Sequence, residues 1–199
     1  MIDPNDVTDH ARSGRQLEEF LLFCIVVAGK NADQQARKLE DFLQGNEPFA
    51  FIRSLGANGA VEDRLRSVKL GKYRVLGESF RRVAGAGLDL RSCPWEALTQ
   101  FPGIGIKTAK FFVLHSRAGE MHGVLDTHVL AWMRERLASG GARRFDVPRH
   151  SPQVAAAYGF WETVYFGLIL ARAAGRTVSS DPINWAQVDL DLWKERRAL

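Results

Sequence analysis

Apolar residues recur at helical spacing along most of this chain, and no segment shows the strict alternation of apolar and polar residues that marks a β-strand. Helices are predicted over residues 16–28, 32–42, 47–55, 61–68, 73–84, 94–98, 107–115, 126–137, 152–173 and 182–194. The long apolar stretch 152–173 is either one continuous helix or two helices with a break near Gly159. The predicted fold class is therefore all-α.

Polar residues in front of these segments predict where several helices begin. The candidate N-caps are Asn31, Ser92 or Cys93 ahead of Pro94, Asp126, and Ser180 or Asp181 ahead of Pro182. Gly29 is a candidate C-cap for the first helix. The stretch 28–33 therefore predicts a turn between two helices.

The composition is that of an ordinary soluble globular protein, with 46% hydrophobic and 25% charged residues. A chain of 199 residues is long enough for one domain or two small lobes. The net charge of +4 mildly favours a polyanionic partner. No apolar run is long enough to span a membrane, and the N-terminus lacks the apolar core of a signal peptide, so a cytoplasmic location is expected.

The stretch Phe101-Pro-Gly-Ile-Gly-Ile-Lys-Thr-Ala-Lys110 predicts a tight turn that opens a helix. Pro102 fixes φ, while Gly103 and Gly105 permit backbone angles and close approaches that a Cβ would block. The first N–H groups of the helix then lie at the positive end of its dipole, where they can bind an anion such as a DNA phosphate. Lys107 would lie near that anion.

A second stretch, Val124-Leu-Asp-Thr-His-Val129, places Asp126 19 residues after Lys107. Together the two stretches resemble the helix-hairpin-helix superfamily of base-excision DNA glycosylases, in the group of endonuclease III and 8-oxoguanine DNA glycosylase. The pattern of that group is L-P-G-V-G-x-K-T-A followed by V-D-T-H. The likeness is strongest over residues 92–133 and weaker over 15–90.

The resemblance implies two helical lobes with a cleft between them. The first would be a helical barrel lobe of residues 15–121, with the helix-hairpin-helix at about 92–117. The second would combine residues 1–14 with 122–199. The cleft would place Lys107 opposite Asp126.

The resemblance also implies a DNA glycosylase with AP-lyase activity. Lys107 would attack C1′ of the sugar, displace the damaged base and form a Schiff base, for which its amine must be neutral. Asp126 would stabilise the positive charge that develops on the sugar. Each residue also has a simpler interpretation, because Lys107 can bind a phosphate without catalysis and Asp126 can cap a helix.

Several residues are candidates for DNA contact. Gly103, Gly105 and an exposed Lys110 would face the phosphate backbone. By position, the stretch 28–33 resembles the loop with which the family enters the minor groove, and this resemblance implies that Lys30 or Asn31 is the wedge that fills the gap left by the flipped base. The turn at 28–33 is compatible with both a purely structural role and the wedge. The basic stretch Lys69-Leu-Gly-Lys-Tyr-Arg74 is either a backbone contact or a solvated face.

The cofactor expectations follow from the same likeness. A monovalent cation, K⁺ or Na⁺, would be bound by the backbone carbonyls of Thr99, Phe101 and Ile104. The two cysteines, Cys24 and Cys93, cannot ligate a four-cysteine iron–sulfur cluster of the kind usual in the endonuclease III branch. We therefore expect a member without the cluster.

The damaged base is expected to be 8-oxoguanine, in double-stranded DNA bound by a monomer. An animal-type 8-oxoguanine enzyme carries a cysteine four residues after the lysine, where this chain has Phe111. Phe111, Trp161 and Trp193 are candidates either for stacking on the base or for the core. The alternatives are an oxidised-pyrimidine glycosylase of the same fold and a non-catalytic helix-hairpin-helix module that clamps a phosphate.

Overall fold

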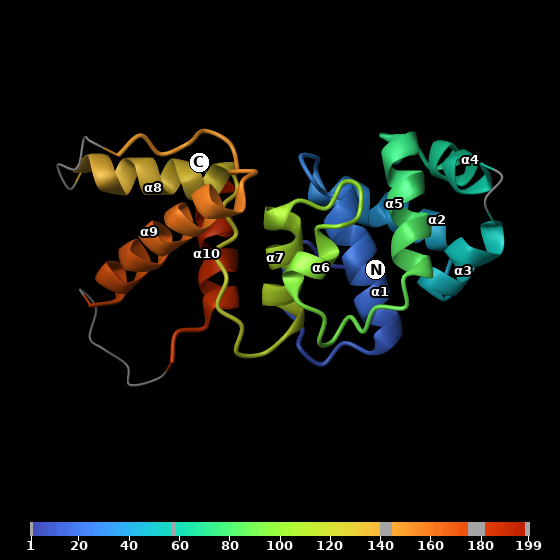
Figure 1. Cartoon of the computed structure of the whole chain (residues 1–199), viewed down its shortest axis with the longest axis horizontal. Helices are drawn as coiled ribbons and strands as arrows, with labels where there is room; N and C mark the ends of the chain where they lie inside the picture. The colour runs from blue at the N-terminus through green and yellow to red at the C-terminus, as the bar shows by residue number, and fades with distance from the viewer. Residues whose placement is uncertain (1, 57–58, 140–144, 175–181, 198–199) are drawn as a thin grey trace. The chain divides into compact units, whose positions relative to one another are not determined.

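The computed structural model describes residues 2–56, 59–139, 145–174 and 182–197. These residues form helices and no strand, so the all-α prediction is confirmed (Figure 1). The helices are α1 Gly14–Val26, α2 Ala32–Leu43, α3 Pro48–Leu55, α4 Ala60–Ser67, α5 Tyr73–Gly85, α6 Trp95–Leu98, α7 Ile106–Ser116, α8 Thr127–Ser139, α9 Ala155–Ala174 and α10 Trp185–Arg197. Among the described helices, none combines the length and the apolar character that a membrane span requires.

The chain divides into two compact units, Met1–Ala118 with α1 to α7 and Gly119–Leu199 with α8 to α10. The boundary after Ala118 falls close to the expected one after residue 121. Residues 2–14 differ from the expectation, because they belong to the first unit and not with the C-terminal helices.

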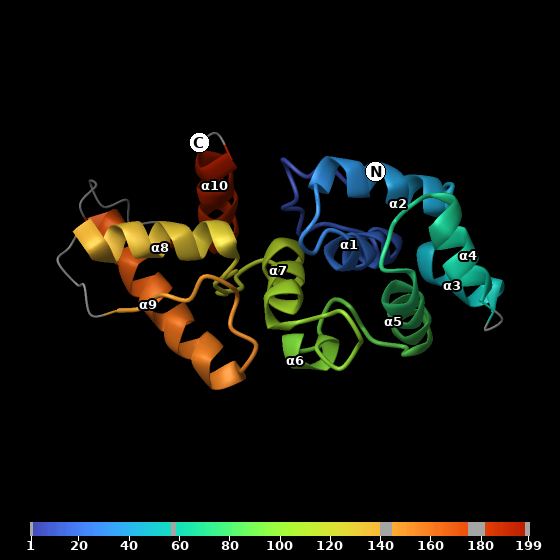
Figure 2. The same ribbon diagram turned by 90° about the horizontal axis from the view of Figure 1, so that it is seen from above.

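Helix α1 is the centre of the first unit. Every residue from Phe20 to Val26 is buried, and the helix contacts α2, α3, α5 and α7 (Figure 2). A helix that is apolar on all sides must be covered on all sides, which explains this central place. Its start is fixed by a capping box in which Ser13 and Gln16 each bond the backbone N–H of the other.

The N-terminal segment is tied to α7 by the side chain of Arg12, which is only 4% exposed. Its guanidinium donates to the carbonyls of Val7 at 2.6 Å, Asp9 at 2.9 Å and His115 at 2.8 Å. The Thr8 hydroxyl bonds Nδ1 of the buried His115 at 2.8 Å. These bonds explain why residues 2–14 lie with the first unit.

Two predicted N-caps are confirmed. The Asn31 side chain accepts from the Gln34 N–H at 3.0 Å at the start of α2, and the Asp126 carboxylate accepts from the Val129 N–H at 2.8 Å at the start of α8. The predicted C-cap Gly29 is wrong, because Val27 occupies the C-cap position of α1 and its N–H donates to the Phe23 carbonyl at 3.0 Å. Gly29 lies two residues further on, in the turn before α2, with φ of +71°.

Other boundary predictions were wrong. Pro94 itself occupies the N-cap position of α6, because the Ser92 hydroxyl instead donates to the Asp89 carboxylate. Helix α9 runs through Gly159 without a break. Helix α10 begins at Trp185, where Asn184 accepts from the Gln187 N–H at 3.1 Å. Pro182 precedes that helix, and Ser180 and Asp181 lie outside the described residues.

Candidate functional site

The turn between α6 and α7 is closed by its own backbone. The Phe101 N–H donates to the Leu98 carbonyl at 3.2 Å, and the Ile104 N–H donates to the Phe101 carbonyl at 3.1 Å. Gly103 adopts φ of +81°, a left-handed conformation that favours glycine. A Cβ at Gly103 would also stand 3.3 Å from Cγ1 of Val75, so the turn lies against the first turn of α5.

The N-terminus of α7 has the features that attract an anion. Gly105 is its N-cap and is exposed, and no side chain caps the helix. The first-turn N–H groups of an α-helix have no intrahelical partners, and they lie at the positive end of the dipole. Gly103 and Gly105, both exposed, leave room for a phosphate at this end.

Lys107 lies in the first turn of α7 and is half-buried. Within the described part of the chain its ammonium forms no hydrogen bond or ion pair. The charge of Lys107 lies close enough to α1 to affect the pKa of the buried Cys24 thiol. Burial raises the pKa of Cys24, and the charges of Arg12 and Lys107 oppose that rise. A half-buried amine without a partner is available to a substrate.

Asp126 ends an extended segment and caps α8 in the second unit. It is half-buried, and its N–H donates to the Val124 carbonyl at 2.8 Å. One carboxylate oxygen, Oδ1, is committed to the cap. Lys107 belongs to the first unit and Asp126 to the second, so each is placed only within its own unit.

Lys110 does not lie where the sequence predicted. The side chain is only 6% exposed, and its ammonium lies 4.9 Å from the ring centroid of Trp95. Three residues after Lys107 along α7, it faces the side of the helix that packs on α6. The prediction of an exposed, phosphate-facing lysine is therefore wrong.

Lysine side chains link the turn after α1 and helix α2 to the stretch before α5, because each side donates to backbone carbonyls of the other. Lys30 donates to the carbonyl of Leu70, Lys38 to that of Lys69 at 3.0 Å, and Lys72 to that of Ala28 at 3.4 Å. We call Lys30, Lys38, Lys69 and Lys72 the lysine cluster. Burial lowers the pKa of Lys30, and the charges of Lys72 and Lys38 add to the effect.

The proposed wedge residues have structural roles in this arrangement. Lys30 is half-buried and bonded to the opposite loop, while the exposed Asn31 caps α2. Lys69 and Lys72 both have positive φ, at 55° and 49°, which is rare for residues with a side chain. The sequence indicated Lys69 and Lys72 as a basic stretch, but it gave no signal for Lys38, whose partner lies 31 residues away.

The three carbonyls proposed for a cation differ in their hydrogen bonds. The Phe101 carbonyl accepts from Ile104, whereas no backbone hydrogen bond reaches the carbonyls of Thr99 or Ile104 within the described residues. A carbonyl oxygen has two lone pairs, so one hydrogen bond leaves room for a metal ion. The hydrogen bonding of the three carbonyls is therefore compatible with the predicted monovalent cation. No group of three His, Cys, Asp or Glu side chains among the described residues could hold a metal.

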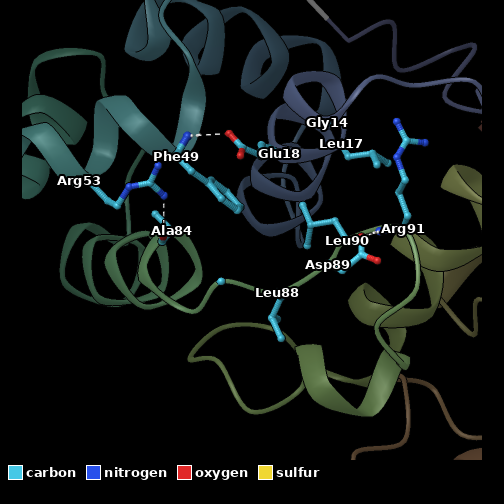
Figure 3. A pocket seen from close by; sticks show the side chains of 11 residues that line it. Gly14, Leu17, Glu18, Phe49, Arg53, Ala84, Leu88, Asp89, Leu90 and Arg91 are labelled. Atoms are coloured by element: carbon cyan, nitrogen blue, oxygen red, sulfur yellow. Dashed lines mark hydrogen bonds between the residues drawn. The ribbon is translucent and has the colours of Figure 1, made fainter.

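A hollow of about 300 Å³ lies on the first unit, away from these residues (Figure 3). Its charged side chains are engaged in structural bonds. Glu18 accepts from the Phe49 N–H at 2.9 Å, and Arg53 donates to the Ala84 carbonyl at 2.6 Å. None of the residues predicted for the site lines it, so we assign it no role in the candidate site.

Two of the three aromatic candidates for a base pocket, Phe111 and Trp161, pack on other rings. The Phe111 centroid lies 6.0 Å from that of Phe20 and 4.6 Å from that of His115. Trp161 is half-buried beside Phe160, with centroids 5.0 Å apart, and Trp193 is also half-buried. These contacts favour core packing for Phe111.

Comparisons with protein-family models, with curated proteins and with solved structures find no match to this chain.

Proposed function

We propose that this chain is a DNA glycosylase with AP-lyase activity, of the helix-hairpin-helix type and without an iron–sulfur cluster. The observation that carries the proposal is Lys107, a half-buried lysine without a partner among the described residues, in the uncapped first turn of α7. The glycine turn before it supplies the anion-binding geometry. The stretch that ends in Asp126 supplies the second element of the resemblance.

In the proposed reaction, the neutral amine of Lys107 attacks C1′ of a flipped nucleotide. The bond between C1′ and the base breaks, and the base leaves with the bonding electrons and takes the proton that the attacking amine gives up. The C1′–O4′ bond of the sugar ring then opens, O4′ takes a proton, and a protonated Schiff base forms between the lysine nitrogen and C1′. Loss of a C2′ proton then breaks the C3′–O bond and nicks the strand. Asp126 contributes negative charge that stabilises the cationic sugar.

Two surfaces of the first unit are proposed to bind the DNA backbone. The first is the N-terminus of α7 with Gly103 and Gly105, where a cation on the carbonyls of Thr99, Phe101 and Ile104 would add positive charge. The second is the lysine cluster, and Lys30 of this cluster and the neighbouring cap residue Asn31 stay candidates for the minor-groove wedge. Lys110 is left out, because it is buried.

We propose 8-oxoguanine as the excised base, with oxidised pyrimidines as the alternative. A lysine nucleophile together with the missing cluster favours an oxidised purine. Phe111 stands where animal-type enzymes have a cysteine, so the base pocket would be built differently from theirs.

Borohydride trapping tests the mechanism and the substrate together. The protein is incubated with duplexes that contain an abasic site, 8-oxoguanine or thymine glycol, and the Schiff base is reduced to a stable adduct. We expect an adduct with the abasic and 8-oxoguanine duplexes, lost in Lys107→Gln. Lys110→Gln, three residues further along α7, is the matched control and should keep the adduct. Circular dichroism checks that both variants fold.

Each alternative outcome has a definite meaning. An adduct with thymine glycol and not with 8-oxoguanine would keep the mechanism and replace the substrate. An adduct lost in Lys110→Gln and kept in Lys107→Gln would reassign the nucleophile. Tight DNA binding with no adduct and no excision would identify a non-catalytic phosphate clamp and contradict the proposal.

A further inference from the structure

The extended segment before Asp126 is held by side chains of one helix. Gly123, Val124 and Leu125 are all buried, yet no strand lies among the described residues to pair with their backbone. Buried backbone N–H and C=O groups need hydrogen-bond partners, because leaving one unpaired destabilises the fold. Here the partners come from α9.

Two residues of α9, one helical turn apart, provide these bonds. The Tyr158 hydroxyl accepts from the Leu125 N–H at 3.0 Å and donates to the Gly123 carbonyl at 2.8 Å. The Glu162 carboxylate accepts from the Gly123 N–H at 2.8 Å. Three side-chain bonds thus fix the backbone of residues 123–125, as a neighbouring strand would do in a sheet.

The absence of a side chain at Gly123 makes this approach possible. A Cβ there would stand 3.0 Å from Cδ1 of Tyr165 and 3.1 Å from Cγ of Glu162, closer than ordinary contact allows. The segment therefore lies directly against the face of α9 that carries residues 158, 162 and 165. Tyr158 and Tyr165 are each only 1% exposed.

The Tyr158 hydroxyl keeps the proton that it donates. Burial raises the pKa of Tyr158 well above its ordinary value. The hydrogen bond from Leu125 lowers this pKa, whereas the charges of Glu162, Asp189 and Asp126 raise it further. The raised pKa favours the neutral phenol, which is the form that can donate to the Gly123 carbonyl.

Asp126 follows directly on this fixed backbone. Its own N–H donates to the Val124 carbonyl, and its Oδ1 accepts from the Val129 N–H at the start of α8. The carboxylate is thus oriented from both sides, by the anchored segment before it and by the helix after it. A shift in residues 123–125 would move the carboxylate.

We infer that Tyr158 and Glu162 are positioning residues for Asp126. They touch no substrate, and they act by holding the segment 123–125. The inference rests on the proposed function, in which Asp126 stabilises the sugar cation. It adds that α9, through Tyr158 and Glu162, sets the rate of that step without contributing to DNA affinity.

The test compares hydroxyl deletions at two tyrosines of the same helix. Tyr158→Phe removes two of the three bonds to the segment. Tyr165→Phe is the matched control, because Tyr165 is equally buried but forms none of the three hydrogen bonds to the segment. Glu162→Ala removes the third bond, while Glu162→Gln keeps an acceptor oxygen and should rescue it.

Three quantities are measured on the full chain: the single-turnover rate of excision and borohydride trapping, the Kd for an uncut damaged duplex, and amide exchange in the protein without DNA. We expect Tyr158→Phe and Glu162→Ala to lower the rate by roughly 10- to 100-fold, as a misplaced catalytic group does. The Kd should stay within about 2-fold, because no DNA contact is removed. Exchange of the Leu125 amide should speed up in Tyr158→Phe, and Tyr165→Phe and Glu162→Gln should resemble the wild type.

The outcomes separate this inference from the proposed function. A wild type that neither excises nor traps removes the proposed function and the positioning role together. A wild type that traps, with Tyr158→Phe as fast as Tyr165→Phe, removes the positioning role alone. A Kd that weakens in step with the rate would also contradict positioning, since the side chains would then serve DNA binding or folding in general.

Discussion

At the scale of single residues, Asp126 combines a structural and a proposed catalytic role. Its Oδ1 caps α8 by accepting from the Val129 N–H, and this bond was predictable because an aspartate before an apolar helical segment is a common N-cap. The proposed role uses the negative charge of the same group. The two roles can be separated, because asparagine caps a helix about as well as aspartate but is neutral.

Asp126→Asn is therefore expected to keep the fold and lose the reaction. The unfolding free energy should change by less than about 0.5 kcal/mol, since Asn and Asp are similar caps. The single-turnover excision rate should fall by roughly 100-fold or more, which is the usual cost of removing one group that stabilises charge in a transition state. Urea denaturation and single-turnover assays measure the two effects.

Asp126→Ala serves as the comparison, because it removes the cap and the charge together. It should cost about 1 kcal/mol of stability in addition to the lost rate. Excision at the wild-type rate by Asp126→Asn would show that the charge has no catalytic role and leave Asp126 as a cap only.

At the scale of helices, α4 and α5 pack through a glycine. A Cβ at Gly77 would clash with Oε1 of Glu62, whose carboxylate pairs with Arg81 at 2.6 Å. The hydrogen bond from Arg81 is the main cause that lowers the pKa of Glu62. Gly77 thus makes room for an ion pair between two helices at the cost of helix propensity.

The effect of Gly77→Ala should depend on Glu62. In the wild type, the gain of about 1 kcal/mol in helix propensity is offset by displacement of Glu62, and the net change should be near zero. In a Glu62→Ala background the same substitution should stabilise the protein by about 1 kcal/mol. Urea denaturation of the four variants in a double-mutant cycle measures this coupling.

The coupling should also depend on pH, with a definite sign. A carboxyl whose pKa is lowered in the folded state stabilises the fold above its unfolded pKa of about 4.3, and that contribution is lost as the pH falls further. The coupling measured at neutral pH should therefore shrink in acid. Equal effects of Gly77→Ala in both backgrounds would contradict the packing described.

The comparison of helices with their predictions shows which information is local. Asn31 and Asp126 were predicted as caps because a cap bond joins residues three apart in the sequence. The bond of Lys30 to Leu70 spans 40 residues, and no local pattern indicates it. Lys110 was placed on the surface from its residue type alone, but packing on Trp95 determines its position.

The same distinction applies to the candidate site. The turn and the places of Lys107 and Asp126 in the first turn or cap of a helix follow from glycine, proline and capping patterns over a few residues. Tyr158 and Glu162 could not be predicted, because their partners lie more than 30 residues earlier in the chain. Apolar spacing predicted the helix but not which polar groups its buried face would bind.

At the scale of the whole molecule, the N-terminal segment of the first unit is bonded to the last helix of that unit, α7. Arg12 and Thr8 bond His115, so the N-terminal segment is tied to the last helix of the same unit. Val7 is also buried, at 3% exposure. The fragment that ends at Ala118 is therefore expected to unfold cooperatively by itself, which circular dichroism during urea denaturation would show.

A fragment of residues 14–118 is the matched control. Without residues 1–13 it loses Arg12 and buried Val7 and leaves the His115 carbonyl without its donor. We expect it to be less stable than 1–118 by about 2 kcal/mol or more. A gradual, non-cooperative loss of helix in the 1–118 fragment would show that the first unit depends on the rest of the chain.

The hydrogen bonds between α9 and residues 123–125 also protect the protein against aggregation. An extended stretch with unpaired N–H and C=O groups is a template on which another chain can add a strand and begin to aggregate. In this protein the Tyr158 hydroxyl and the Glu162 carboxylate occupy the N–H and C=O of Gly123 and the N–H of Leu125. Helix α9 thus satisfies backbone groups of residues 123–125 with which a neighbouring molecule could otherwise pair.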